Sequence, residues 1–140
     1  MKKVKIVFSV IALYIIVSSS HCGKGGHGDD RLTIVNKSNA KIASFLQYNY
    51  PDTSIQPQNT PGFNAISVEP FSESVHLTFV KWEKLIPQNN SQNTLMLFIY
   101  SADTIMAKSW TEIQAEYNIL KRYDLTLEQL KNQNWKVIYP

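Results

Sequence analysis

The first 22 residues have a pattern that separates them from the part of the chain expected to fold. Three lysines, at positions 2, 3 and 5, precede an uncharged apolar run at residues 6–17, and small residues follow it. This order of basic, apolar and small residues is typical of a signal peptide. As a helix the run would span about 18 Å, short of the roughly 30 Å hydrocarbon core of a bilayer, so a permanent membrane-spanning helix is the weaker interpretation. We expect residues 1–21 to be a leader and residues 31–140 to form the folded body.

Cys22 follows the predicted leader directly. It is the only cysteine of the chain and therefore cannot form an intramolecular disulfide. The residues around it resemble a bacterial lipobox, in which the cysteine is acylated and the chain is cut just before it. Cysteine is required there because its thiolate is the nucleophile that takes the lipid group. Ser19 and His21 depart from the usual lipobox, which has an aliphatic residue three before the cysteine and Gly, Ala or Ser just before it. We predict lipid attachment at Cys22. Ordinary cleavage after Ser20, giving a soluble periplasmic protein, is the alternative.

Residues 22–30 are predicted to be a flexible tether, because this stretch is rich in glycine and has no large apolar side chain. Gly23, Gly25 and Gly28 match the dinucleotide-binding spacing formally, but no strand precedes them and a strand follows them. His27 and the neighbouring aspartates are better explained as a solvated tether than as a metal site. We expect neither a cofactor nor a metal ion.

The charge balance of the body bears on the kind of partner to expect. The chain has 14 Lys+Arg and 11 Asp+Glu, and loss of the three leader lysines leaves 11 of each sign. A body near neutrality gives no reason to expect a nucleic-acid or an anionic-membrane partner for the domain.

The pattern beyond residue 31 predicts a mainly β (α+β) fold, a single antiparallel β-sandwich-like domain of five or six strands. Alternation of apolar and polar residues indicates half-buried strands, and the continuous apolar run at residues 94–100 indicates a central strand covered on both faces. A sandwich is favoured over a barrel. The expected strands are residues 32–36, 41–50 (one face buried and one exposed), 66–68, 74–79 (with Val75, Leu77 and Phe79 inward), 94–100 and 135–139.

One or two short helices are expected before the last strand. Ser109 and Glu112 have the spacing of a capping box, and Trp110, Ile113, Tyr117 and Leu120 would form one stripe facing the sheet. Thr126 and Gln129 predict a second capping box, opening a helix with Leu127 and Leu130 inward.

Few side chains in the body are candidates for chemistry. Glu112 and Glu116 lie four apart on the predicted helix, opposite its apolar stripe, so we expect solvent-facing carboxylates with ordinary pKa values. His76 falls on the polar phase of its strand, and a catalytic arrangement would depend on that residue alone. The basic pair Lys121 and Arg122 is expected at a helix C-terminus, where cations complement the helix dipole.

Aromatic residues are candidates for a binding surface. Trp82 would lie on the exposed phase of its strand if Val75, Leu77 and Phe79 are buried, and an exposed indole usually has a partner. Trp82 is therefore the predicted ligand or partner residue. A wider sugar-stacking platform would add Tyr48, Tyr50, Phe63 and Tyr100, but most of these aromatics are expected to lie in the core.

The last third of the chain resembles a known group of proteins. Ser109-Trp110, residues 118–125 (NILKRYDL), Leu130 and residues 134–140 (NWKVIYP) are similar to the tail of small, uncharacterised lipoproteins of Bacteroidetes. The resemblance implies an exported lipoprotein. We expect its lipid to anchor it to a bacterial membrane, namely the outer membrane. It implies no catalytic residues.

A tether, a compact domain, long polar loops and no catalytic motif together favour a binding module over an enzyme. We therefore expect an accessory lipoprotein that contacts a glycan or an envelope protein. The alternatives are a soluble periplasmic protein and a small envelope enzyme without a recognisable motif.

Overall fold

The structure, a computed structural model, describes residues 30–54 and 65–140. The predicted leader, Cys22, the tether up to residue 29 and Phe63 lie outside the described residues. The expectations that rest on them therefore stay predictions of the sequence.

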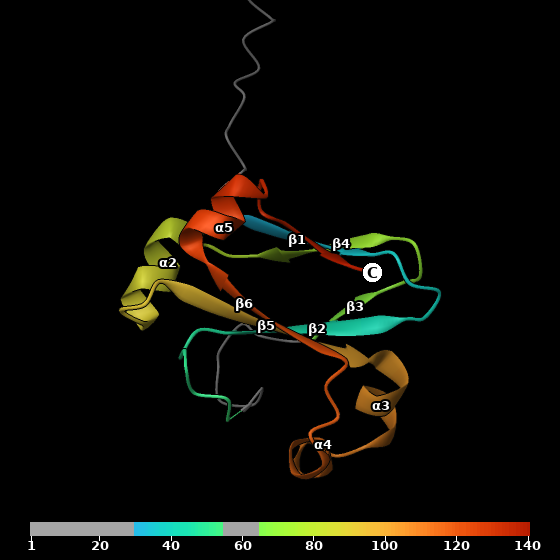
Figure 1. The fold of residues 1–140 in the computed structure, drawn as a ribbon. Helices are drawn as coiled ribbons and strands as arrows, with labels where there is room; N and C mark the ends of the chain where they lie inside the picture. Colours follow the sequence, from blue (N-terminus) through green and yellow to red (C-terminus); the bar gives the residue numbers. More distant parts are fainter. Residues whose placement is uncertain (1–29, 55–64) are drawn as a thin grey trace, which may run out of the picture.

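Two packed β-sheets form the body, with short helices at their ends and beneath them (Figure 1). Two of these helices, α3 and α4, lie under the larger sheet, on the side away from the smaller sheet. In chain order the elements are β1 (Arg31–Asn36), β2 (Ile42–Gln47), β3 (Ile66–Val68), β4 (Glu73–Leu77), α2 (Trp82–Asn89), β5 (Thr94–Ser101), α3 (Ala102–Ala107), α4 (Trp110–Glu116), β6 (Lys121–Thr126), α5 (Leu127–Asn132) and β7 (Lys136–Tyr139).

The smaller sheet has the order β4-β1-β7 and the larger one β3-β2-β5-β6. All neighbours pair antiparallel except β1 and β7, which run parallel. The C-terminal strand thus lies beside the first strand of the body. The predicted mainly β, sandwich-like fold is confirmed, and the parallel pair is the one departure from an antiparallel arrangement.

The main core lies between the sheets. It contains Leu32 and Ile34 of β1, Ile42 and Leu46 of β2, Leu95, Leu97 and Ile99 of β5, and Val137 of β7, all buried. A second apolar cluster lies on the opposite face of the larger sheet, where Met96, Phe98 and Tyr100 of β5 meet Ile113 of α4. Strand β5 is therefore buried on both faces, as its continuous apolar run predicts.

Strand β2 corrects one expectation. The sequence predicts one buried and one exposed face, but every residue from Ile42 to Leu46 is buried. Phe45 belongs to the second cluster, and its ring meets Trp110 edge-on with centroids 4.7 Å apart. The helices cover the face that alternation alone would leave to water.

Strand β4 has the opposite phase to the one predicted. His76 is buried, whereas Leu77 and Phe79 are exposed and Val75 is only half-buried. The reason is the register with β1, in which His76 stands opposite the buried Leu32. Directly opposed residues share a sheet face, so β1 turns His76 toward the core.

Helix α2 was missed by the sequence analysis, and with it the position of Trp82. The strand ends at Leu77, so its alternation does not extend to Trp82, which begins the helix. Trp82 and Ile86, one turn apart, are both fully buried in the main core. Pro87 in the last turn hides the helical pattern, because proline is read as a helix breaker.

Helix α4 is shorter than its predicted stripe. The capping box of Ser109 and Glu112 is confirmed, and Ile113 is buried. The helix ends at Glu116, however, and Tyr117 adopts a left-handed conformation that turns the chain away. Tyr117 and Leu120 are consequently exposed, contrary to expectation.

The basic pair Lys121 and Arg122 lies in strand β6, which the sequence analysis missed, and not at a helix C-terminus. The predicted second helix is confirmed as α5. It has a capping box of Thr126 and Gln129, and its Leu130 is buried.

Candidate functional site

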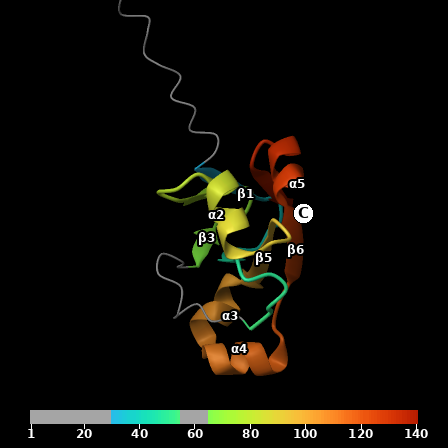
Figure 2. The same cartoon turned by 90° about the vertical axis from the view of Figure 1, so that its left-hand side faces the viewer.

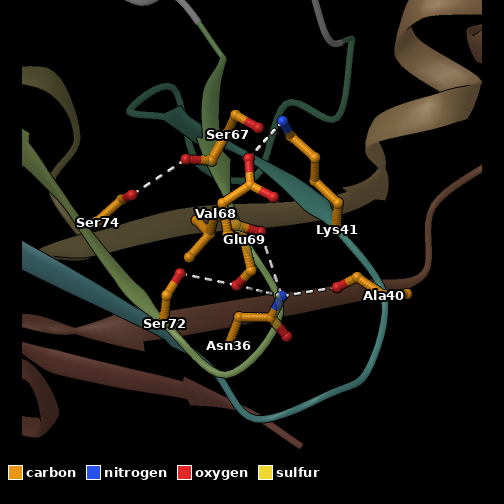
Figure 3. Close-up of polar contacts among 8 residues, drawn as sticks. All are labelled: Asn36, Ala40, Lys41, Ser67, Val68, Glu69, Ser72 and Ser74. Carbon is orange, nitrogen blue, oxygen red and sulfur yellow. Dashed lines mark hydrogen bonds and ion pairs between the residues drawn. The ribbon is translucent and has the colours of Figure 1, made fainter.

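One side of the sandwich is closed by polar contacts between the sheets (Figure 3). The turn after β3 leads directly into β4, and the Ser74 hydroxyl of the smaller sheet donates to the Ser67 carbonyl of the larger one at 3.0 Å. Lys41 pairs with Glu69 at 2.5 Å on the same side. The Ser74–Ser67 contact thus links the two sheets on this side.

Asn36, at the end of β1, holds this closed side together. Its side chain is fully buried. The amide nitrogen lies 2.7 Å from the Ala40 carbonyl, 3.2 Å from that of Val68 and 3.1 Å from that of Glu69. Its oxygen accepts from the backbone N–H and the hydroxyl of Ser38. Asn36 therefore ties both neighbouring turns to the smaller sheet.

The opposite side, between β6 and β7, is open. Among the described residues, β6 and β7 each pair with one strand only and are edges of their sheets. The Tyr123 hydroxyl bridges them by donating to the Ile138 carbonyl at 2.9 Å. A cavity of about 400 Å³ lies beside this bridge, lined by Tyr123, Leu125, Gln133, Lys136, Val137 and Ile138. We call it the β6–β7 groove.

The floor of the β6–β7 groove is apolar and its rim is polar. Leu125 and Val137 are buried members of the main core, whereas the side chain of Ile138 is 46% exposed. At the rim, Lys136 lies 3.2 Å from Glu73, and the ammonium of Lys121 lies 4.9 Å from the centre of the Tyr123 ring. An apolar floor with a few polar groups is the usual composition of a ligand pocket.

Trp82, the predicted partner residue, is not at this site or on the surface. Its ring is fully buried and stacks on Tyr48, with centroids 6.2 Å apart. That prediction is wrong. The described members of the wider aromatic platform do not share a face, because Tyr48 lies between the sheets while Tyr50 and Tyr100 pack on the other face of the larger sheet. These three residues are part of the core, as most of the aromatics were expected to be.

The structure brings His76 close to a serine, a contact that the sequence did not suggest. The ring Nε2 lies 2.8 Å from the Ser44 hydroxyl, and both side chains are buried. Burial lowers the pKa of His76 to about 4, so the imidazole is neutral near pH 7. A substrate cannot reach this pair from the surface, and we interpret it as a hydrogen bond that satisfies two polar groups in the core.

Glu112 and Glu116 are exposed, as expected, but the prediction of ordinary pKa values is wrong. Hydrogen bonds from Ser109 lower the pKa of Glu112, and hydrogen bonds from Lys108 and Asn118 lower that of Glu116. A general acid needs the opposite shift. These carboxylates serve the helix cap and its neighbouring turn.

Within residues 30–54 and 65–140, no group of three His, Cys, Asp or Glu side chains is placed to hold a metal ion. None of the helices in this part of the chain is long and apolar enough to cross a membrane.

No protein-family model, no curated protein and no solved structure matches this chain. The resemblance to Bacteroidetes lipoproteins therefore stays a prediction from the sequence.

The groove residues could not be predicted from the sequence, because the start of β6 has the pattern expected for the end of a helix. One signal was available: Tyr123, Leu125 and residues 136–138 lie within the C-terminal stretches that carry the resemblance.

Proposed function

We propose that this protein is an exported binding module, anchored to the outer membrane of a bacterial cell envelope through a lipid on Cys22. The leader and the single cysteine support the anchor. The β6–β7 groove, an apolar hollow between two strand edges, is the observation that carries the binding role.

The partner that fits this groove best is an extended segment of an envelope protein. A strand edge has backbone N–H and C=O groups that a peptide can pair with, and the apolar floor would accept alternate side chains of such a peptide. A glycan is the second candidate. It is less favoured because the ammonium of Lys121 already lies over the Tyr123 ring, the groove's one aromatic surface.

Binding is also favoured over catalysis. The buried Ser44–His76 pair lies away from the groove lining. The lining residues carry apolar, amide, phenol and ammonium groups, and the Glu73 carboxylate at the rim is paired with Lys136. Such a set can hold a partner, but it lacks the paired acid and base of a hydrolytic site.

The anchor is tested by labelling cells with a palmitate analogue and fractionating them, comparing wild type with Cys22→Ser. We expect label and membrane association in the wild type. Both should be lost, or replaced by unprocessed precursor, in the variant, because the nucleophile is gone. A wild-type protein that is unlabelled and soluble, with its N-terminus at His21, would show the soluble periplasmic alternative instead.

The groove is tested by a photo-crosslinking amino acid at Ile138, with the same group at Gln114 of α4 as the matched control. Both positions are exposed, and only the first lies in the groove. We expect a discrete adduct from position 138 in living cells and none from position 114. Peptides of a second protein in the adduct, identified by mass spectrometry, show a protein partner, and loss of the added mass on glycosidase treatment shows a glycan. Equal adducts from both positions would contradict the groove as the binding site.

A further inference from the structure

Three apolar side chains lie exposed within four residues, at the end of β4 and on the loop that leads from it to α2. Leu77 is 67% exposed, Val80 is 42% exposed and Phe79 is exposed completely. We call the segment that carries them, residues 77–80, the 77–80 loop. Clustered exposed apolar side chains of this kind mark a surface that has a partner. The β6–β7 groove does not include them.

The loop is fastened to the N-terminal end of the body. The backbone N–H of Thr78 donates to the carbonyl of Asp30 at 3.1 Å, and Leu77 stands opposite Arg31 in the sheet. Figure 2 shows the loop projecting from the body between β4 and α2, at the end where the described chain begins and away from α4. The exposed apolar side chains therefore lie at the point where the preceding residues join the domain.

The distance to Cys22 is limited by the length of the chain. Seven residues lie between Cys22 and Asp30, so the connection has eight residue-to-residue steps and reaches about 28 Å even when fully extended. If the lipid on Cys22 is in a bilayer, Asp30 is held near its surface, and the 77–80 loop is held there with it. This step rests on the proposed anchor.

The composition of the loop and its surroundings suits a lipid surface. Phenylalanine and branched aliphatic side chains enter the boundary between headgroups and acyl chains. Exposed Arg31 stands opposite Leu77 in the sheet, and exposed Lys81 follows Val80 directly in the chain. Basic residues in such positions favour anionic headgroups. The acids next to these two residues in the chain are Asp30 and Glu83, and Glu83 is paired with Lys131 at 3.3 Å.

We propose that the 77–80 loop is a second membrane contact, in which Leu77, Phe79 and Val80 enter the lipid interface and fix the orientation of the anchored domain. The opposite end of the molecule, with α3 and α4, then faces away from the membrane. The β6–β7 groove opens along the side.

The test uses the full chain, expressed and processed in cells, purified and placed in vesicles of phosphatidylcholine and phosphatidylglycerol. Acylation occupies the thiol of Cys22, so Phe79→Cys introduces one free thiol for an environment-sensitive fluorophore. Gln114→Cys, exposed on α4, is the matched control. We expect a blue shift and a several-fold rise of emission at position 79 only. Quenching there should be stronger by a nitroxide near the headgroup than by one near the end of the acyl chain.

The anchor and the loop are scored separately. The mass of the purified protein reports the lipid on Cys22, and an unmodified mass would overturn both the proposed anchor and this inference. A lipidated protein in which the labels at positions 79 and 114 behave alike would overturn this inference only. A shift at position 79 that grows with the number of protein molecules per vesicle would assign the loop to contacts between copies and would also overturn it.

Discussion

Two buried polar residues, Asn36 and His76, connect separate segments of the fold by hydrogen bonds. Asn36 offers its amide to carbonyls of two different turns, and His76 meets the hydroxyl of Ser44 between the sheets. Each group would cost free energy if it were buried without a partner, and each joins segments that are distant in the chain. These residues therefore select one packing of the sheets over others.

Asn36→Ala is expected to lower the free energy of unfolding by about 2–3 kcal/mol, because buried carbonyls lose their donor. Asn39→Ala is the control, since Asn39 is exposed in the same turn, and it should change stability by less than about 0.5 kcal/mol. Urea unfolding of both variants measures the difference. Similar losses in the two would mean that the Asn36 contacts contribute little.

His76 makes stability depend on pH. The unfolded imidazole takes a proton near its ordinary pKa of 6.5, whereas burial holds the folded pKa at about 4. Between these values the unfolded state binds more protons, so its contribution is complete above pH 6.5 and is lost as the pH falls toward 4. The loss amounts to about 3 kcal/mol at most.

An NMR titration of the histidine ring signals checks this directly. We expect the His76 signals to stay those of a neutral ring until the pH approaches 4. Urea unfolding at several pH values should show the matching loss of stability. A His76 ring that titrates near its ordinary pKa of 6.5 would contradict its burial.

At the level of single elements, the helices decide which strand faces are dry. Strands β2 and β5 are covered on one face by the smaller sheet and on the other by α4 and its neighbour α3. The part of α4 that does this is short, because the left-handed Tyr117 ends the helix one turn after its buried residue. One turn of helix is enough to bury Ile113 completely, next to the rings of the second cluster.

Ile113→Ala is therefore expected to lower stability by about 2–4 kcal/mol through the cavity that it leaves. Leu120→Ala should change it by less than about 1 kcal/mol, because this side chain is 51% exposed. Thermal unfolding of the two variants compares them. Equal destabilisation would restore the longer stripe that the sequence predicts.

At the level of the whole molecule, the last strand completes the first sheet. Strand β7 runs parallel to β1, and its Val137 is buried in the main core. Without it the smaller sheet keeps only β4 and β1, and two strands are marginal by themselves. The closure of the fold thus depends on a contact between the two ends of the body.

Removal of residues 136–140 is expected to abolish cooperative unfolding, because the core loses Val137 and β1 loses a partner. Removal of the exposed Pro140 alone should leave the unfolding transition unchanged. Circular dichroism during a thermal scan distinguishes the two. A cooperative transition in the longer truncation would show that β7 is an accessory strand.

Local patterns in the sequence determined much of this protein. The apolar run of β5, the capping boxes of α4 and α5, and the strands β1, β3 and β7 each depend on short-range geometry and hydrogen bonding within a few residues. These features gave the mainly β class correctly. The tertiary structure decided what alternation cannot, namely which face of a strand is covered. The register with β1 turned His76 inward, and α3 and α4 buried the second face of β2.

The candidate groove depended on tertiary structure entirely. It exists because β6 and β7, separated in the chain by α5, end as neighbouring edges of different sheets. No local pattern reports which strands become edges, since pairing is chosen by long-range contacts. Long-range packing also decides the position of Trp82. Strand alternation continued to this residue predicts an exposed side chain, but Trp82 begins a helix and is buried.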